Sequence, residues 1–248
     1  REGELLYEVF VDQQRTPVTL DQVPDTLKQA TVAIEDKNFY EHSGFDPVGI
    51  LRGVYLTVFT DRTAGGSTLT QQLVKNVLLT SERSIARKVK EFILAVQIES
   101  KYNKDEILQM YLNEAPYGGT AWGVQSAAQL YFNKDVMDLN LVESAILAGM
   151  PQLPSVYTPF GSNPNAYIGR TEAVLRRMRE DGYIDQDQEA SASGELADYE
   201  FQRGLVGLEA PHFSLYVKQQ LEEMYGAEMV EKGGLVVTTT LDSEIQNQ

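Results

Sequence analysis

At residues 33–46 the sequence reads Ala33-Ile-Glu35-Asp36-Lys-Asn-Phe39-Tyr-Glu-His42-Ser-Gly44-Phe-Asp46. An apolar helical pattern ends there at two adjacent carboxylates, and a glycine then stops or turns the chain. Two more pieces follow: Gly65-Gly-Ser67-Thr-Leu-Thr-Gln71-Gln72-Leu-Val-Lys75-Asn76, and Arg87-Lys88-Val-Lys-Glu91. Acids, hydroxyls, amides and cations thus follow one another closely on segments with helical signals. We expect the functional site in this part of the chain.

The composition is that of a globular protein with room for a substantial core. Of the 248 residues, 42% are hydrophobic and 23% are charged. The chain can therefore hold one large domain, or one domain with an extension. It contains no cysteine, which excludes disulfides and thiolate metal sites, and its two histidines disfavour a histidine-rich zinc site.

The charge distribution is uneven. The net charge of −15 argues against nucleic acid as the main partner. Residues 180–248 contain fifteen acidic and three basic side chains, whereas residues 75–104 contain seven basic and three acidic ones. A basic island in an acidic protein calls for an anionic partner or a structural explanation.

Helical periodicity dominates the chain. Helix signals occur at 24–36, 46–59, 67–80, 84–102, 104–113, 123–131, 139–148, 165–181, weakly at 185–198, and at 211–225. We expect loops at 116–119 and 151–164, which are punctuated by glycine or proline. Strands are expected only near the two ends, at 4–11 and 234–241. The helix at 46–59 is apolar over a broad surface, so it is either a buried core helix or a surface helix that dips into a bilayer or lipid groove.

The sequence contains no apolar run long enough to span a membrane. Its polar start, Arg1-Glu-Gly-Glu-Leu5, has none of the features of a signal peptide. We interpret this as a start within a longer protein, so the missing span carries no conclusion about the whole protein.

Glu35 and Asp36 end an apolar helical stretch and lie close to Phe39 in the sequence. A carboxylate with apolar neighbours can act as a general base or acid. The same pair can also be a solvated helix face. His42 fits a structural hydrogen-bonding residue more easily than a metal ligand.

The glycines before Ser67-Thr68 place backbone N–H groups and hydroxyls at a predicted helix start, where an anion is favoured. This can equally be an ordinary helix cap with a Thr68 and Gln71 capping-box spacing. Lys75 follows about two turns along this helix and Arg83 comes after its end. These cations can converge on a pyrophosphate or lie on a solvated surface.

Glu91 has Arg87 four residues and Lys88 three residues before it, so all three share one helix face. A carboxylate beside cations in a cleft can assist a leaving pyrophosphate, directly or through a divalent metal. The spacing alone also fits a simple salt bridge.

Together and in this order, the pieces resemble the motifs of the peptidoglycan glycosyltransferases, family 51, which polymerise lipid II into glycan strands. The five matching motifs are Glu35-Asp36-x-x-Phe39-x-x-His42-x-Gly44, Gly66-Ser67-Thr68-x-Thr70-Gln71-Gln72 with Lys75-Asn76, Arg87-Lys88-x-x-Glu91, Lys104-x-x-Ile107-Leu108-x-x-Tyr111-Leu112-Asn113, and Arg170-x-x-x-Val174-Leu175. The match runs from about residue 20 to 180, and its second motif is long enough to be highly specific.

The resemblance implies a mainly α fold, a lysozyme-like helical bundle with a large head and a small membrane-facing jaw near residues 46–64. That placement favours bilayer contact for the apolar helix. It also implies a glycosyltransferase domain at 1–205. Residues 206–248 include Gly234-Leu-Val-Val-Thr-Thr-Thr-Leu-Asp242 and resemble the linker towards the transpeptidase domain of class A (bifunctional) penicillin-binding proteins. We therefore expect a membrane anchor and a transpeptidase domain outside this sequence.

The resemblance further implies a mechanism. Glu35 would be the general base that deprotonates the GlcNAc 4-hydroxyl of lipid II, whose oxygen attacks C1 of the terminal MurNAc of the growing chain. Undecaprenyl pyrophosphate leaves, and a β-1,4 bond forms with inversion. Glu91 would assist departure of the pyrophosphate or place a Mg2+ or Mn2+ ion there, whether or not the metal is obligatory. The other implied substrate-binding residues are Asp36, Phe39, His42, Arg52, Ser67, Gln71, Gln72, Lys75, Arg83, Arg87, Lys88 and Asn113.

The partners implied by the resemblance are lipid II, the undecaprenyl-pyrophosphate-linked glycan chain, the membrane surface and moenomycin-type inhibitors. The implied location is the extracytoplasmic side of a bacterial cytoplasmic membrane. Two other functions remain open: a glycan-cleaving lysozyme or lytic transglycosylase, which also uses one key glutamate, and a non-catalytic lipid- or glycan-binding scaffold. The cations argue against the first, because a neutral sugar polymer does not need them. The presence of both glutamates argues against the second.

Overall fold

The computed structural model describes residues 16–45, 66–79, 84–119, 121–160, 163–202, 211–226, 229–230, 235 and 237–241. Some of the predictions fall outside these ranges. They concern the strand at 4–11, the apolar helix and jaw at 46–64, and the residues Arg52 and Arg83.

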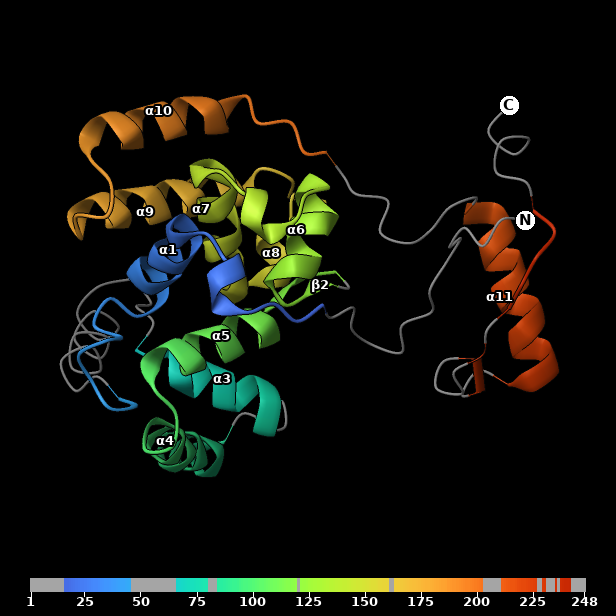
Figure 1. The fold of residues 1–248 in the computed structure, drawn as a ribbon, viewed down its shortest axis with the longest axis horizontal. Coiled ribbons are helices and arrows are strands. Elements are labelled where there is room, and N and C mark those ends of the chain that lie inside the picture. Colours follow the sequence, from blue (N-terminus) through green and yellow to red (C-terminus); the bar gives the residue numbers. More distant parts are fainter. Residues whose placement is uncertain are drawn as a thin grey trace.

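The described part of the chain is mainly helical, as predicted (Figure 1). Its α-helices are α1 (Asp25–Glu35), α3 (Leu69–Leu78), α4 (Ile85–Glu99), α5 (Lys104–Glu114), α6 (Val124–Phe132), α7 (Leu141–Gly149), α8 (Pro154–Tyr157), α9 (Ala166–Glu180), α10 (Gln186–Ala197) and α11 (Pro211–Tyr225). Short 3-10 helices are η1 (Leu20–Gln22), η2 (Val136–Asp138) and η3 (Met150–Gln152), and the strands are β1 (Pro116–Gly118) and β2 (Ala121–Trp122). None of the described helices is long and apolar enough to cross a bilayer.

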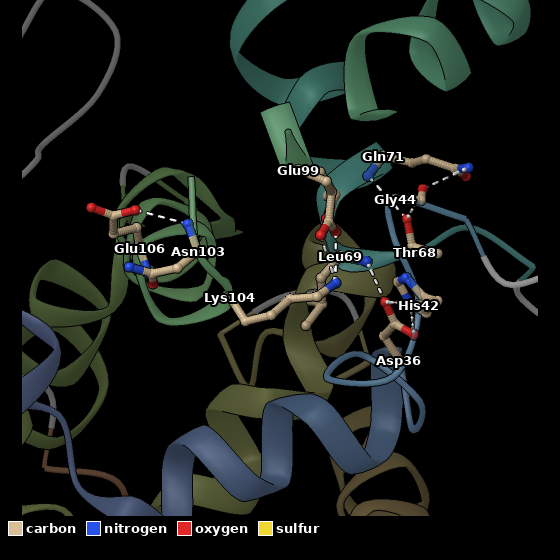
Figure 2. A network of polar contacts seen from close by, with 11 residues as sticks. Asp36, His42, Gly44, Thr68, Leu69, Gln71, Glu99, Asn103, Lys104 and Glu106 are labelled. Atoms are coloured by element: carbon tan, nitrogen blue, oxygen red, sulfur yellow. Dashed lines mark hydrogen bonds and ion pairs between the residues drawn. The ribbon is translucent and has the colours of Figure 1, made fainter. Parts of the chain in front are cut away.

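Polar side chains cap α3, α4 and α5, which carry the second, third and fourth motifs. The Thr68 hydroxyl accepts the backbone N–H of Gln71 at 3.2 Å at the start of α3, and Ser84 accepts that of Arg87 at 3.1 Å at the start of α4. Asn103 caps α5 within a reciprocal capping box (Figure 2). Each cap satisfies an N–H group that has no partner inside its helix. The predicted helix starts at Thr68 and Ser84 are confirmed.

The core is built around α7, whose residues Val142–Gly149 are all buried. Helices α1 and α9 pack on α7 and on each other (Figure 1). The face of α1 that carries Leu27, Ala30 and Ile34 is buried, as its spacing predicts. Helix α3 packs on α4 and α5. The C-terminal end of α1 is therefore held between the α7–α9 pair and the group formed by α3, α4 and α5.

The β structure differs from the prediction. The described strands are β1 and β2, an antiparallel pair that begins in the segment predicted to be a loop at 116–119. Gly118 and Gly119 have φ of +95° and +58°, which allows the chain to turn between the strands. Residues 235 and 237–241, in the segment predicted to be a strand, are not in one. A β-rich segment needs a partner strand, and no described residue pairs with this segment. The loop predicted at 151–164 contains η3 and α8, because proline fits the first turn of a helix.

A cluster of aromatic rings covers the core where the chain leaves α10. Its members are Tyr131, Phe132, Phe160, Tyr167, Tyr199 and Phe201. The Phe201 ring is stacked on Phe132, with centroids 5.9 Å apart, and meets Tyr167 edge-on at 5.0 Å. The Tyr199 hydroxyl donates to the buried carboxylate of Glu143 at 2.7 Å. The helical body therefore extends to Phe201, while the predicted boundary at 205 stays a prediction.

We expect Phe201→Ala to lower the free energy of unfolding by about 2 kcal/mol, because a partly buried ring and its aromatic contacts are lost. Glu200→Ala is the matched control, since Glu200 is the neighbouring residue and its side chain takes no part in the ring cluster. Urea unfolding followed by fluorescence measures both variants. Equal stability of Phe201→Ala and Glu200→Ala would show that the helical body ends before Phe201.

Candidate active site

Glu35 is the last residue of α1, and its side chain is only 8% exposed. One carboxylate oxygen lies 2.7 Å from Nη2 of Arg170 on α9. The other accepts a hydrogen bond from Nε2 of Gln72 on α3 at 2.8 Å. Two helices distant in sequence thus fix both oxygens of this carboxylate, so its polar atoms have partners although the side chain is buried.

Two buried tyrosines lie behind this carboxylate. The Tyr111 hydroxyl on α5 donates to the side-chain oxygen of Gln72 at 3.4 Å, which fixes the direction of the amide that faces Glu35. Burial, and next the charge of Glu35, raises the pKa of Tyr111 well above its usual value and also raises the pKa of Tyr117 on β1. Both phenols therefore stay neutral, and no second negative charge arises from them beside Glu35.

Asp36 joins the end of α1 to the beginning of α3 (Figure 2). Its buried carboxylate accepts the Leu69 backbone N–H at 3.0 Å and lies 2.9 and 3.0 Å from Nε2 of His42. A carboxylate at a helix N-terminus satisfies a free N–H group and interacts favourably with the helix dipole. The opposite ring nitrogen of His42, Nδ1, is buried without a hydrogen-bond partner in the described part of the chain.

The start of α3 is also fastened to the loop that follows the first motif. Thr68 Oγ1 donates to the carbonyl oxygen of Gly44 at 3.1 Å, and Nε2 of Gln71 donates to the same oxygen at 3.4 Å (Figure 2). Gly44 has φ +89°, and a Cβ there would lie 3.1 Å from the backbone of Ala95 on α4. This position therefore requires glycine for both its conformation and its space.

Helices α3, α4 and α5 share a partly buried ion pair (Figure 2). Glu99, at the end of α4, accepts from Thr70 of α3 at 2.6 Å and from Lys104 of α5 at 2.8 Å. The Lys104 ammonium also lies 4.5 Å from the centre of the Phe39 ring. Phe39 is fully buried, so in this structure it is a packing residue of the first motif.

A cationic cluster surrounds Glu91 on α4. Its carboxylate, whose side chain is 3% exposed, lies 2.8 Å from the Lys88 ammonium and 3.3 Å from Nε of Arg87. The Lys88 ammonium also donates to the hydroxyl of Ser67 at 2.8 Å, just before the start of α3. The predicted salt bridge is thus present, and it brings the second and third motifs together. Arg87 Nε and Glu91 Oε1 form an ion pair with each other, and neither atom makes a hydrogen bond among the described residues.

The charges of both glutamates act on Lys75 of α3. Lys75 is exposed to solvent overall, but partial burial of its ammonium group lowers the pKa of Lys75. The negative charges of Glu91 and Glu35 oppose that effect. Arg87 and Lys88 lower the same pKa further. Three cations around one carboxylate leave the Glu91 side of α3 with an excess of positive charge.

Not every predicted site residue lies in this arrangement. Asn113 of α5 exchanges two 2.8 Å hydrogen bonds with the backbone of Val18 and donates to the carbonyl of Gln109 at 2.9 Å. Its amide is used by the backbone, which favours a structural role over a substrate-binding one. Conversely, sequence reasoning gave no role to Arg170, although the fifth motif contains it. The signal that could have identified Arg170 is its charge: it is a cationic residue at a motif position to which no role was assigned from the sequence.

Two hollows of the described surface lie elsewhere. One of about 430 Å³ and one of about 320 Å³ are both lined by Leu20, Tyr40 and Asp105; further residues of α5 line the first, and residues of α1 line the second. Neither is lined by Glu35 or Glu91. The assignment of the site therefore depends on the paired carboxylates and cations and not on the shape of these hollows.

Comparison with known proteins gives a match to the transglycosylase family over residues 2–179. The chain belongs to the transglycosylase family. This transglycosylase chain is 41% identical over 239 residues to penicillin-binding protein 1A of Escherichia coli K12, covering 96% of the chain and 28% of the relative. It is 36% identical over 240 residues to penicillin-binding protein 1F of Bacillus subtilis 168, covering 94% and 33%.

Among solved structures, the transglycosylase chain is similar to the 2.6 Å crystal structure of penicillin-binding protein 1A from Haemophilus influenzae. The TM-score is 0.54 and the identity is 26%, over 92% of this chain and 24% of that one. The chain thus spans a third or less of the length of these relatives. The predicted family is confirmed, and so is the predicted enzyme class, a peptidoglycan glycosyltransferase domain of the class A penicillin-binding protein type.

The lowered pKa of Lys75 makes anion binding sensitive to alkaline pH. A lysine loses its charge as the pH rises through its pKa, so wild-type affinity for inorganic pyrophosphate should fall before the usual lysine range near 10.5 is reached. Lys75→Arg should lose less affinity between neutral pH and about pH 10, because arginine stays charged there.

Isothermal titration calorimetry with inorganic pyrophosphate measures this difference, and the comparison between the two proteins removes the ligand's own titration. Lys101→Arg is the matched control, since Lys101 is an exposed lysine just beyond α4. A parallel loss of affinity in wild type and Lys75→Arg would contradict a role for Lys75 in holding the anion.

Proposed function

We propose that this domain polymerises lipid II into β-1,4-linked glycan strands, transferring the growing chain from undecaprenyl pyrophosphate to the GlcNAc 4-hydroxyl of lipid II with inversion. One observation supports this most strongly. A buried carboxylate fixed by two donors contacts α3 through Gln72, and a cluster with excess positive charge contacts Ser67, just before the start of α3. An inverting displacement of a pyrophosphate needs one base and one stabilised leaving group, and these are the two parts present.

In the proposed acceptor step, Glu35 takes the proton of the 4-hydroxyl as the oxygen of that group attacks C1 of the terminal MurNAc. The new O–C1 bond forms while the bond from C1 to the pyrophosphate oxygen breaks, and the electron pair leaves with the pyrophosphate. Arg170 and Gln72 keep the Glu35 carboxylate in a single orientation, which lowers the cost of aligning base and hydroxyl.

In the proposed donor step, the leaving pyrophosphate is held by the cations around α3 and α4. Lys88, already placed on the Ser67 hydroxyl, and Lys75 would carry most of the charge interaction. Gln71 would complete the donor pocket: its side-chain oxygen, buried without a partner among the described residues, would accept from a hydroxyl of the donor sugar. Glu91 would keep Lys88 and Arg87 in place.

A divalent cation, Mg2+ or Mn2+, fits this arrangement only in part. Glu91 Oε1 is a buried oxygen without a hydrogen bond among the described residues, but it already pairs with Arg87 Nε at 3.3 Å, and no group of three or more acidic or histidine side chains gathers in the described ranges. Glu91 would hold the ion together with phosphate oxygens of the substrate, as is usual for magnesium. When bound, the ion would offset the negative charge of the leaving group.

The proposed partners follow from the same reaction: lipid II, the lipid-linked glycan chain and the membrane surface. The proposed location is the extracytoplasmic side of a bacterial cytoplasmic membrane, and the linker at 206–248 would lead to a transpeptidase domain. Arg52 and Arg83 are proposed as further phosphate contacts. Moenomycin-type phosphoglycolipids, which resemble the growing chain, would occupy the donor side, and a failure to compete with lipid substrate would count against that assignment.

The proposal predicts that Glu35→Gln lowers the rate of lipid II polymerisation by about a hundredfold or more, because the amide cannot accept the hydroxyl proton. The measurement is polymer formation from labelled lipid II in detergent with a divalent metal. Glu41→Gln is the matched control, as Glu41 is an exposed acid of the loop that follows Glu35, and its rate should equal that of wild type.

Three other outcomes separate the alternatives. Polymer from Glu35→Gln at the wild-type rate would move the base elsewhere, with Glu91 as the next candidate. Shortening of preformed glycan strands without any polymer would support a lytic enzyme. Binding of lipid II without either activity, in wild type, would support a non-catalytic scaffold.

A further inference from the structure

We propose that Arg170 is the positioning residue of this site: its guanidinium holds the carboxylate of Glu35 in place and supplies positive charge beside it before substrate binds. The inference rests on the proposed role of Glu35 as the base. A base must be unprotonated when it meets the hydroxyl, and a buried carboxylate without a cation tends to take up a proton. The Glu35 side chain is 8% exposed, with the Arg170 guanidinium 2.7 Å away.

Arg170 is fixed by contacts that do not involve Glu35. Its Nε donates to the carbonyl oxygen of Gly149, at the end of α7, at 3.1 Å. Its guanidinium carbon lies 5.9 Å from the centre of the Tyr157 ring on α8, within the range of a cation–π contact. The side chain is 15% exposed, and its helix packs on both α7 and α1. These contacts fix the position of the guanidinium independently of Glu35, whose carboxylate then pairs with it.

The other groups that face Glu35 do not replace this cation. Lys75 of α3 interacts with Glu35 through its charge, but no ion pair joins the two within the described residues. Tyr111 of α5 and Tyr117 of β1 stay neutral, and Asp36 adds negative charge. Among the described residues, Arg170 is the cation in direct contact with Glu35.

A substitution at Gly149 offers a second, independent way to displace the Arg170 side chain. A Cβ at Gly149 would lie 2.9 Å from Cγ of Arg170 and 3.6 Å from a methyl carbon of Val174. Gly149 has φ −75°, so alanine fits its backbone. Gly149→Ala therefore acts on the site by pushing the stem of Arg170, without touching Glu35. A Cβ at Gly169, the residue before Arg170, would meet nothing within 4 Å, which makes Gly169→Ala the matched control.

The test is the pH profile of kcat/KM for lipid II polymerisation, whose acidic limb reports ionisation of the base in the free enzyme. In Arg170→Met we expect this limb to move about 1 to 2 pH units upward, so that activity lost at neutral pH is partly regained at higher pH. Arg170→Lys should keep the limb near its wild-type position at a lower rate, because it restores the charge but not the planar fork. Gly149→Ala should move the limb in the same direction as Arg170→Met by a smaller amount, and Gly169→Ala should leave it unchanged.

A rate lowered equally at every pH in Arg170→Met and Gly149→Ala would overturn the inference and leave Arg170 a purely structural residue. Wild-type profiles in both would do the same. If Arg170→Met fails to fold, as judged by circular dichroism, the profile of Gly149→Ala decides the matter. Undiminished polymerisation by Glu35→Gln, in contrast, would remove the proposed base itself and so is distinguishable from failure of the inference.

Discussion

The buried carboxylate of Asp36 joins the end of α1 to the beginning of α3. It accepts the Leu69 N–H of α3 and pairs with His42, so a negative charge meets the end of the helix at which the dipole favours it. Glu35 is the neighbouring residue in the chain and cannot move independently of this joint. Because α3 also carries Gln72 and Lys75, the position of the base relative to the cations depends on Asp36.

Around that joint the site divides into two regions with opposite electrostatic requirements. The carboxylate of Glu35 is surrounded by fixed donors and neutral phenols. The region of Glu91 contains more cations than acids: Lys88 and Arg87 both pair with Glu91, and the charge of Glu91 acts on Lys75. Such an excess of positive charge attracts an anionic ligand. The acceptor side is thus preorganised, whereas the donor side is built to be completed by an anion.

Local signals in the sequence predicted much of this. The caps at Thr68 and Ser84 are short-range interactions, readable from residue type and spacing. The contact of Lys88 with Glu91 follows from their separation of three residues on one helix. The buried face of α1 follows from its apolar period. Such features depend on neighbouring residues only, and the sequence presents those neighbours directly.

Contacts between residues far apart in the sequence could not be predicted from such local signals. Arg170 meets Glu35 across 135 positions, and only the packing of α9 against α1 brings them together. Asn113 carries a motif position but binds the backbone of Val18, 95 residues away. Between Pro116 and Trp122 glycine marks a hairpin turn, although the same residue types also describe a loop. The most direct test of the division into two regions is a crystal structure of the protein with inorganic pyrophosphate. We expect pyrophosphate density beside Ser67, Lys75 and Lys88 with the pair of Arg170 and Glu35 intact. Density on Arg170, with Glu35 displaced from it, would contradict the division into an acceptor and a donor region.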